Sequence, residues 1–387
     1  MNTTVSKPRI ASIDILRGMV ILLMLVDHVR ERFYLHKQVL DPMDIESTDV
    51  ELFFTRMTAH LCAPIFVFLT GMSAWLYANP ANGKKRNVQE FLLKRGLILI
   101  ILEMTLINFS WFAAYNTLYL QVIWAIGLSM IALALVAHIP KVWLASLGLL
   151  IVFGHNLLSP IQFSANEFGY SLWTILHDRG YLVTEGIVKV KVSYPVLAWV
   201  GVIMLGYVAG PLFSQAVDSL KRKKILFIAG TSFLALLLLL RGFNLYGETL
   251  DWQVQTNTVM TIMDFLNYTK YPPSLNFLLF ALGIGALALA WLETAKSTWL
   301  DRINVLGSAP MFFYILHLYA LLVCYAIAIY FFGPNISYGA QQLDYFAFSD
   351  VWQVWLFSAF LVAVLYWPCK KFGQFKRNTT MAWVKYF

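Results

Sequence analysis

Ionisable side chains interrupt the first apolar segment of the chain. Residues 10–32 hold an apolar run with Asp14 and Arg17 near its start and Asp27 and His28 near its end. If this segment crosses a membrane, such groups cost free energy at that depth, so they are expected to face a polar interior and to mark a functional site. Histidine titrates near neutral pH and can act as a general base, a nucleophile or a proton relay. The segment therefore predicts a buried polar site with a histidine near one end.

Three further apolar segments carry groups of the same kind. His60 lies near the start of the second segment, while Glu103 and His317 lie in the middle of two later ones. A single histidine among apolar residues often serves only as a hydrogen-bonded structural group, and each is weighed against that interpretation. Glu103 and His317 either line a path between the two faces of the protein or form one structural pair, and the sequence leaves both open.

The composition places these residues in a membrane protein. Of the 387 residues, 59% are hydrophobic and 13% are charged, whereas a soluble domain carries roughly 25% charged residues. The net charge of +8 does not indicate nucleic-acid binding, because the lysines and arginines lie at the ends of apolar segments. The three cysteines are isolated, so we predict neither a disulfide framework nor a metal site.

The apolar segments predict an all-α membrane protein with about ten transmembrane helices and long extracytoplasmic loops. Most lysines and arginines, Lys7 and Arg9 among them, fall in connections that face the cytoplasm if both chain ends are inside, so the positive-inside rule favours N-in and C-in. We expect residues 1–387 to form one domain, with glycines such as Gly71 and Gly206 allowing close helix packing. The predicted spans are approximately 11–34, 55–78, 94–113, 118–138, 141–157, 194–214, 225–242, 273–292, 305–332 and 350–369.

This topology places Asp27, His28 and His60 at similar depth near the outer face, on adjacent antiparallel helices. Asp27 and His28 are sequence neighbours and point about 100° apart around a helix, so we expect Asp27 to pair with another span. The outer ends of other spans add polar side chains, namely Asn108, Gln121, Tyr194, Lys270 and Tyr271. Long outer connections could cover the site, and they comprise residues 35–54, 158–193 and 243–272.

Basic residues mark the opposite, cytoplasmic end. Lys94 and Arg95 open the third span after the basic run 84–86. They either anchor the helix at the membrane surface or line the mouth of a site for a polyphosphate ligand. Asp14 and Arg17 are three residues apart, on one helical face, and could form an ion pair.

Several motifs follow one another in a fixed order: Arg9-x-x-Ser12-Ile13-Asp14-x-x-Arg17-Gly18 with Asp27-His28, Leu52-Phe53-Phe54-Thr55-Arg56-x-x-x-His60-x-Cys62-Ala63-Pro64, Tyr194-Pro195-x-x-x-Trp199-x-Gly201, Lys270-Tyr271-Pro272-Pro273, and Phe312-Phe313-Tyr314-x-Leu316-His317. The ordered set resembles the heparan-α-glucosaminide N-acetyltransferase-like family of membrane acyltransferases over nearly the whole chain. His28 stands where bacterial-type members carry histidine, which implies a protein of a bacterial inner membrane. His60 stands where the lysosomal enzyme has an acidic residue.

The resemblance implies that an acetyl group passes from cytoplasmic acetyl-CoA to an amine or hydroxyl of a sugar or glycan on the outer side. It implies a catalytic histidine, either His28 or His60, with Asp27 beside it. The residues expected to bind the donor are Asp14, Arg17, Lys94, Arg95 and His317, and those expected to hold the acceptor are Arg56, Asn108, Lys270 and Tyr271. The partners are the donor, the acceptor and the lipid bilayer, without metal or nucleic acid, and a homodimer is left open.

A proton-coupled secondary transporter of a small polar solute is the alternative. Ionisable side chains at several depths suit a proton relay. Many carriers show two related halves, and no such repeat is visible in the sequence.

Overall fold

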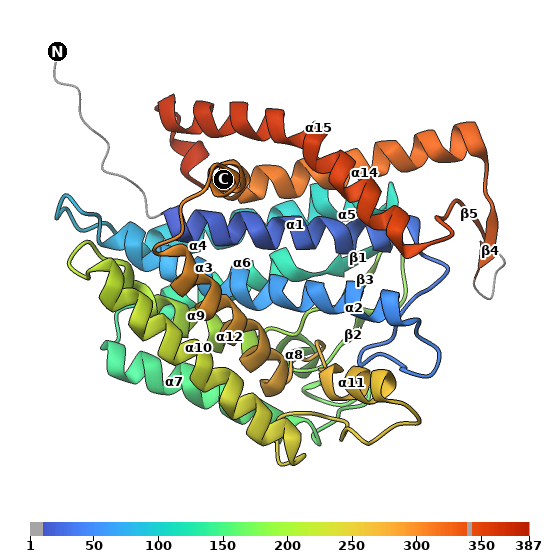
Figure 1. The fold of residues 1–387 in the computed structure, drawn as a ribbon, viewed down its shortest axis with the longest axis horizontal. Coiled ribbons are helices and arrows are strands. Elements are labelled where there is room, and N and C mark those ends of the chain that lie inside the picture. Colours follow the sequence, from blue (N-terminus) through green and yellow to red (C-terminus); the bar gives the residue numbers. More distant parts are fainter. Residues whose placement is uncertain (1–10, 339–342, 387) are drawn as a thin grey trace.

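The computed structural model describes residues 11–338 and 343–386, so Lys7 and Arg9 lie outside the described residues. The chain is mostly helical (Figure 1), and each segment predicted to span a membrane falls on a helix. The helices are α1 (Ala11–Phe33), α2 (Val50–Thr58), α3 (Cys62–Ala78), α4 (Val88–Leu102), α5 (Asn108–Phe112), α6 (Val122–Val136), α7 (Lys141–Gly154), α8 (Tyr170–Leu176), α9 (Leu197–Ala209), α10 (Ser219–Gly242), α11 (Thr258–Leu266), α12 (Leu275–Leu292), α13 (Thr298–Gly307), α14 (Pro310–Phe332) and α15 (Val351–Asn378).

Short helical turns extend or follow several of these helices, at Ala59–Leu61, His155–Leu158, Gly210–Phe213 and Ala382–Tyr386, and a π-helical segment, Glu103–Ile107, joins α4 to α5. The strands are β1 (Thr117–Leu120), β2 (Gly180–Val183), β3 (Lys189–Val192), β4 (Ile336–Tyr338) and β5 (Leu343–Tyr345).

Six helical segments are long and apolar enough to cross a membrane: Val50–Ala78, Lys141–Leu158, Ser219–Gly242, Leu275–Leu292, Pro310–Phe332 and Val351–Asn378. Two further apolar segments, Val122–Val136 and Leu197–Phe213, are shorter. The charged side chains of α1 set it apart from these helices, because Asp14, Arg17 and Asp27 interrupt its apolar surface. The chain is thus an integral membrane protein of packed helices, and a total of about ten spans stays a prediction.

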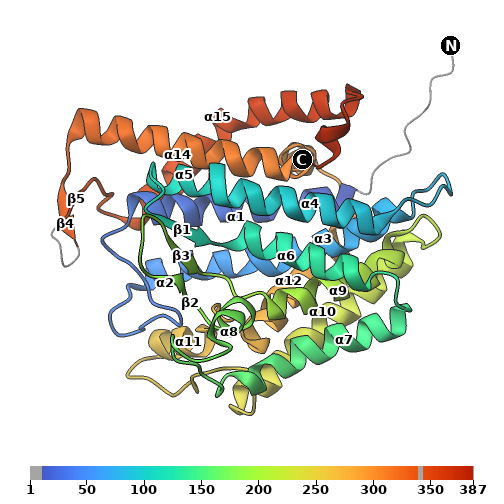
Figure 2. The same ribbon diagram turned by 180° about the vertical axis from the view of Figure 1, so that it is seen from behind.

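Helix α1 lies inside the bundle. It packs against α3, α12, α13, α14 and α15, and it runs along the long axis of the molecule (Figures 1 and 2). Its buried residues include the apolar Ile21 and Leu25 but also Asp14, Asp27 and Arg30. One buried helix therefore carries charged groups to both ends of the bundle.

The strands gather with α8 and α11 at one end of the bundle, which we call the strand end (Figures 1 and 2). Strand β3 pairs with β1 in parallel and with β2 antiparallel, and β4 and β5 form an antiparallel pair. The all-α expectation missed these strands because each has only three or four residues, too few for an alternating pattern to be visible. The N-terminal end of α1 and the C-terminal end of α15 lie at the opposite end, which we call the terminus end (Figure 1).

Glycines bring α3 and α9 into close contact, as expected. A Cβ on Gly71 would lie 2.0 Å from the carbonyl oxygen of Ile203, and a Cβ on Gly206 would lie 2.1 Å from that of Phe68. Backbone atoms occupy the space of the missing side chains, so any larger residue at either position would force the two helices apart.

A buried carboxylate caps the N-terminus of α6. The residue before this helix, Gln121, provides no side-chain cap. Instead, Glu103 Oε2 accepts hydrogen bonds from the backbone nitrogens of Ile123, at 3.0 Å, and Trp124, at 3.1 Å. The first N–H groups of a helix lack partners within the helix and attract negative charge. Glu103 thereby fixes the end of α6 that faces the site described next.

Candidate active site

A cavity of about 960 Å³ lies at the strand end, and we call it the strand-end cavity. The C-terminal half of α1 lines it with Asp27, His28 and Glu31. The long connections that were expected to cover a site also line it, through residues 38–42, Arg179, Lys191, Ser193 and residues 270–271. Residues far apart in the sequence thus meet around one polar space.

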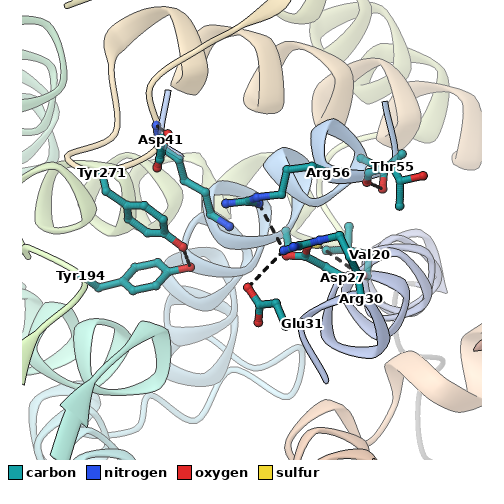
Figure 3. A network of polar contacts seen from close by, with 12 residues as sticks. Val20, Asp27, Arg30, Glu31, Asp41, Thr55, Arg56, Tyr194 and Tyr271 are labelled. Carbon is teal, nitrogen blue, oxygen red and sulfur yellow. Dashed lines mark hydrogen bonds and ion pairs between the residues drawn. The ribbon is translucent and has the colours of Figure 1, made fainter. Parts of the chain in front are cut away.

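Asp27 joins two arginines in the wall of this cavity. Asp27 Oδ1 accepts hydrogen bonds from Arg30 at 2.8 and 2.9 Å, and Asp27 Oδ2 lies 3.5 Å from Arg56 Nη1. Figure 3 shows Arg56 reaching toward Asp27, with Arg30 close to both Asp27 and Glu31. The expectation that Asp27 pairs with another span is confirmed, because Arg56 belongs to α2. One buried carboxylate is shared by two buried guanidinium groups.

His28 forms a pair with His317 of α14. His28 Nδ1 lies 2.7 Å from His317 Nε2, and His317 Nδ1 lies 2.8 Å from the carbonyl oxygen of Phe313. A carbonyl oxygen only accepts, so Nδ1 of His317 carries its hydrogen and donates it. Nε2 of neutral His317 is then an acceptor for His28 Nδ1–H. The lone pair of neutral His28 is left at Nε2, which is the arrangement that a general base needs.

His60 lies deeper in the protein. It is 2% exposed, its ring lies edge-on to Phe277 at 5.2 Å, and within the described ranges its Nδ1 makes no hydrogen bond. His28 lines the strand-end cavity, whereas His60 is not among its lining residues. The two histidines predicted at similar depth therefore differ in their access to the cavity.

The connections that cover the cavity bring their own polar groups. Tyr271 Oη donates a hydrogen bond to Tyr194 Oη at 2.7 Å, and Arg179 lies 4.5 Å from the centre of the Tyr271 ring. Asp41 Oδ1 accepts a hydrogen bond from the backbone nitrogen of Lys270 at 2.9 Å. Burial raises the pKa of Asp41, although nearby cations oppose that rise. These contacts fix the backbone at Lys270 against the loop that follows α1.

A second cavity, of about 1140 Å³, lies at the terminus end, and we call it the terminus-end cavity. Asp14 and Arg17 of α1 line it and form the predicted ion pair at 2.7 Å, and Arg17 also donates to Ser73 Oγ. Its other cationic lining residues are Arg86, Arg95, Lys376 and Arg377. The excess of positive charge suits an anionic ligand.

The two cavities share part of their lining. Phe66 and Thr70 of α3, Arg95 of α4 and Pro310 of α14 line both. Asp14 and His28, at the two ends of α1, are separated by roughly 20 Å along the helix axis. The protein therefore holds two polar cavities that approach the same four residues from opposite ends.

Four predicted site residues line neither cavity, namely His60, Lys94, Asn108 and His317. Lys94 is exposed, and its Nζ donates to Glu90 Oε1 at 2.5 Å, while the neighbouring Arg95 points inward. Asn108 is buried, and its side chain bonds the backbone of Tyr119 at 2.7 and 2.9 Å, which holds the start of α5 against β1. The contacts of Lys94 and Asn108 are those of a surface ion pair and of a structural amide.

The sequence did not identify Tyr314, Lys376 or Arg377 as site residues. Trp111 and Tyr314 place their rings 5.1 and 5.9 Å from that of His28. Tyr314 precedes His317 by three residues and so shares its helical face, a signal that the sequence contained. Lys376 and Arg377, in contrast, reach the terminus-end cavity only through the tertiary fold. Within residues 11–338 and 343–386, no three histidine, cysteine or acidic side chains are grouped to hold a metal ion.

One family model matches the chain. The family model described as "Heparan-alpha-glucosaminide N-acetyltransferase, catalytic" matches residues 9–241, more than half of the chain, and this range includes Asp27, His28 and Arg56. No curated protein matches the chain. Lys270 and His317 lie beyond the matched range but complete the strand-end cavity and the histidine pair. The chain therefore belongs to the heparan-alpha-glucosaminide N-acetyltransferase family, as a membrane acetyltransferase.

Proposed function

We propose that the protein transfers an acetyl group across the membrane, from acetyl-CoA in the terminus-end cavity to an amine or hydroxyl of a sugar or glycan in the strand-end cavity. The observation that carries this proposal is the shared lining of the two cavities at Phe66, Thr70, Arg95 and Pro310. A long thin donor could reach the acceptor there without either substrate crossing completely.

The positions of the chain ends and the cationic lining of the terminus-end cavity suggest which end of the protein faces the cytoplasm. The N-terminal end of α1 and the C-terminal end of α15 lie at the terminus end, which fits N-in and C-in with an even number of spans. On that assignment the cation-rich terminus-end cavity faces the cytoplasm, where acetyl-CoA is found, and residues 1–387 act as one domain. Arg17, Arg86 and Arg95 would then bind the donor phosphates, because guanidinium groups make paired hydrogen bonds to phosphate. A bacterial inner membrane is the proposed location.

His28 would act as the general base. Its Nε2 takes a proton from the acceptor as the acceptor nitrogen or oxygen attacks the thioester carbonyl carbon. The carbon–sulfur bond then breaks, and the CoA thiolate takes that proton from the His28 imidazolium. His317 positions the base, since its Nε2 holds His28 Nδ1–H at 2.7 Å and keeps the lone pair at Nε2.

The acceptor would lie among three other side chains that line the strand-end cavity. Arg56, Lys270 and Tyr271 line this space and offer donors to its oxygen atoms. Asn108 would act indirectly, by holding the backbone of Tyr119, which also lines the cavity. His60 remains the second candidate for the essential histidine.

The test measures label transfer from acetyl-CoA to a panel of amino sugars by the purified protein. We expect His28→Ala to lower kcat about 100-fold or more, since a general base contributes on that order. His317→Phe should lower kcat by less, and His317→Gln, which can still accept a hydrogen bond, should recover part of the loss. His138→Ala is the matched control, because His138 lies between α6 and α7 and is not part of either lining.

Other results would assign the chemistry differently or refute the proposed function. Loss of transfer only in His60→Ala would assign the base to His60 instead of His28. Label that stays on the protein without acceptor would indicate an acetylated histidine intermediate. If the wild-type protein neither binds acetyl-CoA nor transfers the label to any acceptor, the proposed function is wrong, and pH-driven solute uptake should be measured next.

A further inference from the structure

We infer that Tyr314 is a catalytic residue, whose phenol donates a hydrogen bond to the carbonyl oxygen of the thioester and stabilises the negative charge that forms there during transfer. This role rests on the proposed function, because it adds a residue to the same reaction. Two observations carry it: Tyr314 lies between the residues shared by the two cavities and the His28–His317 pair, and its hydroxyl has no acceptor within the described chain.

One face of α14 leads from the shared lining to the histidine pair. Pro310 lines both cavities, Tyr314 lines the strand-end cavity four residues later, and His317 pairs with His28 three residues after that. Spacings of three and four residues keep these side chains on one side of the helix, with Tyr314 about 6 Å beyond Pro310 along the axis. A donor that enters past Pro310 would therefore bring its thioester to Tyr314 before it reaches His28.

The ring of Tyr314 packs against both histidines. Its centre lies 5.9 Å from that of His28 and 5.5 Å from that of His317, and it stands edge-on to both rings. The residue is 5% exposed. Donor groups that are fixed before the reaction stabilise a developing charge without having to reorganise. Packing thus holds the phenol beside the proposed base in the manner that such stabilisation requires.

The hydroxyl of Tyr314 is left with a hydrogen to donate. Within residues 11–338 and 343–386, Tyr314 Oη makes no hydrogen bond. Another phenol of the cavity, that of Tyr271, donates instead to Tyr194 Oη at 2.7 Å. A buried donor without an acceptor costs stability, and the carbonyl oxygen of a bound thioester would provide the acceptor that Tyr314 lacks.

The neighbouring lining residues offer few other donors. Thr70 Oγ1 already donates to the carbonyl oxygen of Phe66 at 2.7 Å. Arg95 is the cation assigned above to the donor phosphates. Next to the shared residues on α3, α4 and α14, the remaining lining of the strand-end cavity has apolar side chains or a thiol, which donates only weakly, and comprises Cys62, Ala63, Leu99 and Met311.

Tyr314 would act while the carbonyl carbon is tetrahedral. As the acceptor nitrogen or oxygen attacks this carbon and gives its proton to His28, the electron pair of the C=O bond moves onto the oxygen, which accepts the hydrogen bond from Tyr314 Oη. The C=O bond then forms again, the carbon–sulfur bond breaks, and the CoA thiolate takes the proton from the His28 imidazolium. Tyr314 keeps its own proton throughout.

The first experiment compares the wild-type protein with Tyr314→Phe, which keeps the ring and removes only the hydroxyl. We expect the single-turnover rate of acetyl transfer to fall about 100-fold, since the loss of one oxyanion donor costs on that order. The affinity for acetyl-CoA, KM for the acceptor and the unfolding temperature should stay unchanged. Tyr330→Phe is the matched control, because Tyr330 is an exposed residue of the same helix and lines neither cavity.

A second experiment changes the substrate instead of the protein. The dithioester analogue of acetyl-CoA has sulfur in place of the carbonyl oxygen, and sulfur accepts hydrogen bonds only weakly. This replacement should slow the wild-type protein more than it slows Tyr314→Phe, by about tenfold or more. If Tyr314 served only in packing or in acceptor binding, the analogue would slow both proteins by the same factor.

The outcomes separate this role from the proposed function. Transfer at the wild-type rate by Tyr314→Phe, or equal slowing of both proteins by the dithioester, would overturn the role of Tyr314 and leave the proposed function standing. Loss of the preference for oxygen in Arg95→Gln, with that preference kept in Tyr314→Phe, would assign the oxyanion to Arg95. A wild-type protein that transfers no acetyl group would refute the proposed function and the role of Tyr314 with it.

Discussion

The histidine pair joins residues 289 positions apart in the chain. His28 comes from α1 and His317 from α14, and the backbone carbonyl of Phe313 sets the hydrogen positions of both rings. In the proposed mechanism, this helix carbonyl would take the role that a carboxylate has in many catalytic triads, without adding a charge beside His28.

The sequence predicted which residues belong to the site better than it predicted which residues they contact. The spacing predicted the pair Asp14–Arg17, and helical geometry predicted a partner for Asp27 on another span, which is Arg56. The direction of each side chain around its helix could not be predicted, because it depends on how neighbouring helices are rotated. For that reason the sequence placed His317 with the donor and Asn108 with the acceptor, whereas the structure places His317 on His28 and Asn108 on the backbone.

Glu248 offers a pH-dependent test of the connections over the site. This carboxyl accepts hydrogen bonds from Ser274 Oγ and from the backbone nitrogen of Thr269, at 3.1 Å, and burial raises its pKa to about 7. A raised pKa means that the folded protein holds the proton more tightly than the unfolded chain. Its stabilising contribution is therefore complete below the unfolded pKa of about 4.5 and is lost as the pH rises toward 7.

We expect the unfolding temperature of the detergent-purified protein to fall between pH 5 and pH 8, with a loss of up to about 3 kcal/mol. Glu248→Gln keeps the hydrogen bonds and removes the ionisation, so its stability should depend less on pH in this range. The same pH dependence in Glu248→Gln and the wild type would contradict the assignment to Glu248.

Among the elements, the helices were predicted from long apolar runs. The short strands carry no such signal and were not predicted. The ten predicted segments correspond to helices because each holds a long apolar run. The three-stranded sheet depends in part on a contact between distant connections, because β1 meets β3 across about 70 residues. No local pattern of three or four residues indicates such pairing.

The start of α6 depends on Glu103 and provides a prediction for an element. Glu103→Leu removes the acceptor of two buried N–H groups, so we expect a loss of about 1–3 kcal/mol in stability. Because Gln121 and Ile123 line the strand-end cavity, KM for the acceptor should rise as well. Glu103→Gln, which keeps an oxygen acceptor, is the control and should lose less. Unfolding in denaturant measures both variants, and a Glu103→Leu protein as stable as the wild type would show that the cap is unimportant.

At the scale of the whole molecule, α1 connects the two halves of the proposed reaction. It carries Asp14 and Arg17 to the terminus-end cavity and Asp27 and His28 to the strand-end cavity. The sequence predicted polar groups at both ends of this helix. It could not predict that the cavities share lining residues, because α3, α4 and α14 supply them and only the packed bundle brings these helices together.

The most direct test of transfer across the membrane uses sealed vesicles that contain the purified protein. Labelled acetyl-CoA is trapped inside, and the acceptor that proved best in detergent is supplied outside. We expect labelled, acetylated acceptor in the external solution while acetyl-CoA stays inside, and His28→Ala vesicles should form little of it. Product that forms only when donor and acceptor share a compartment, in vesicles shown to be sealed, would contradict transfer between the two cavities.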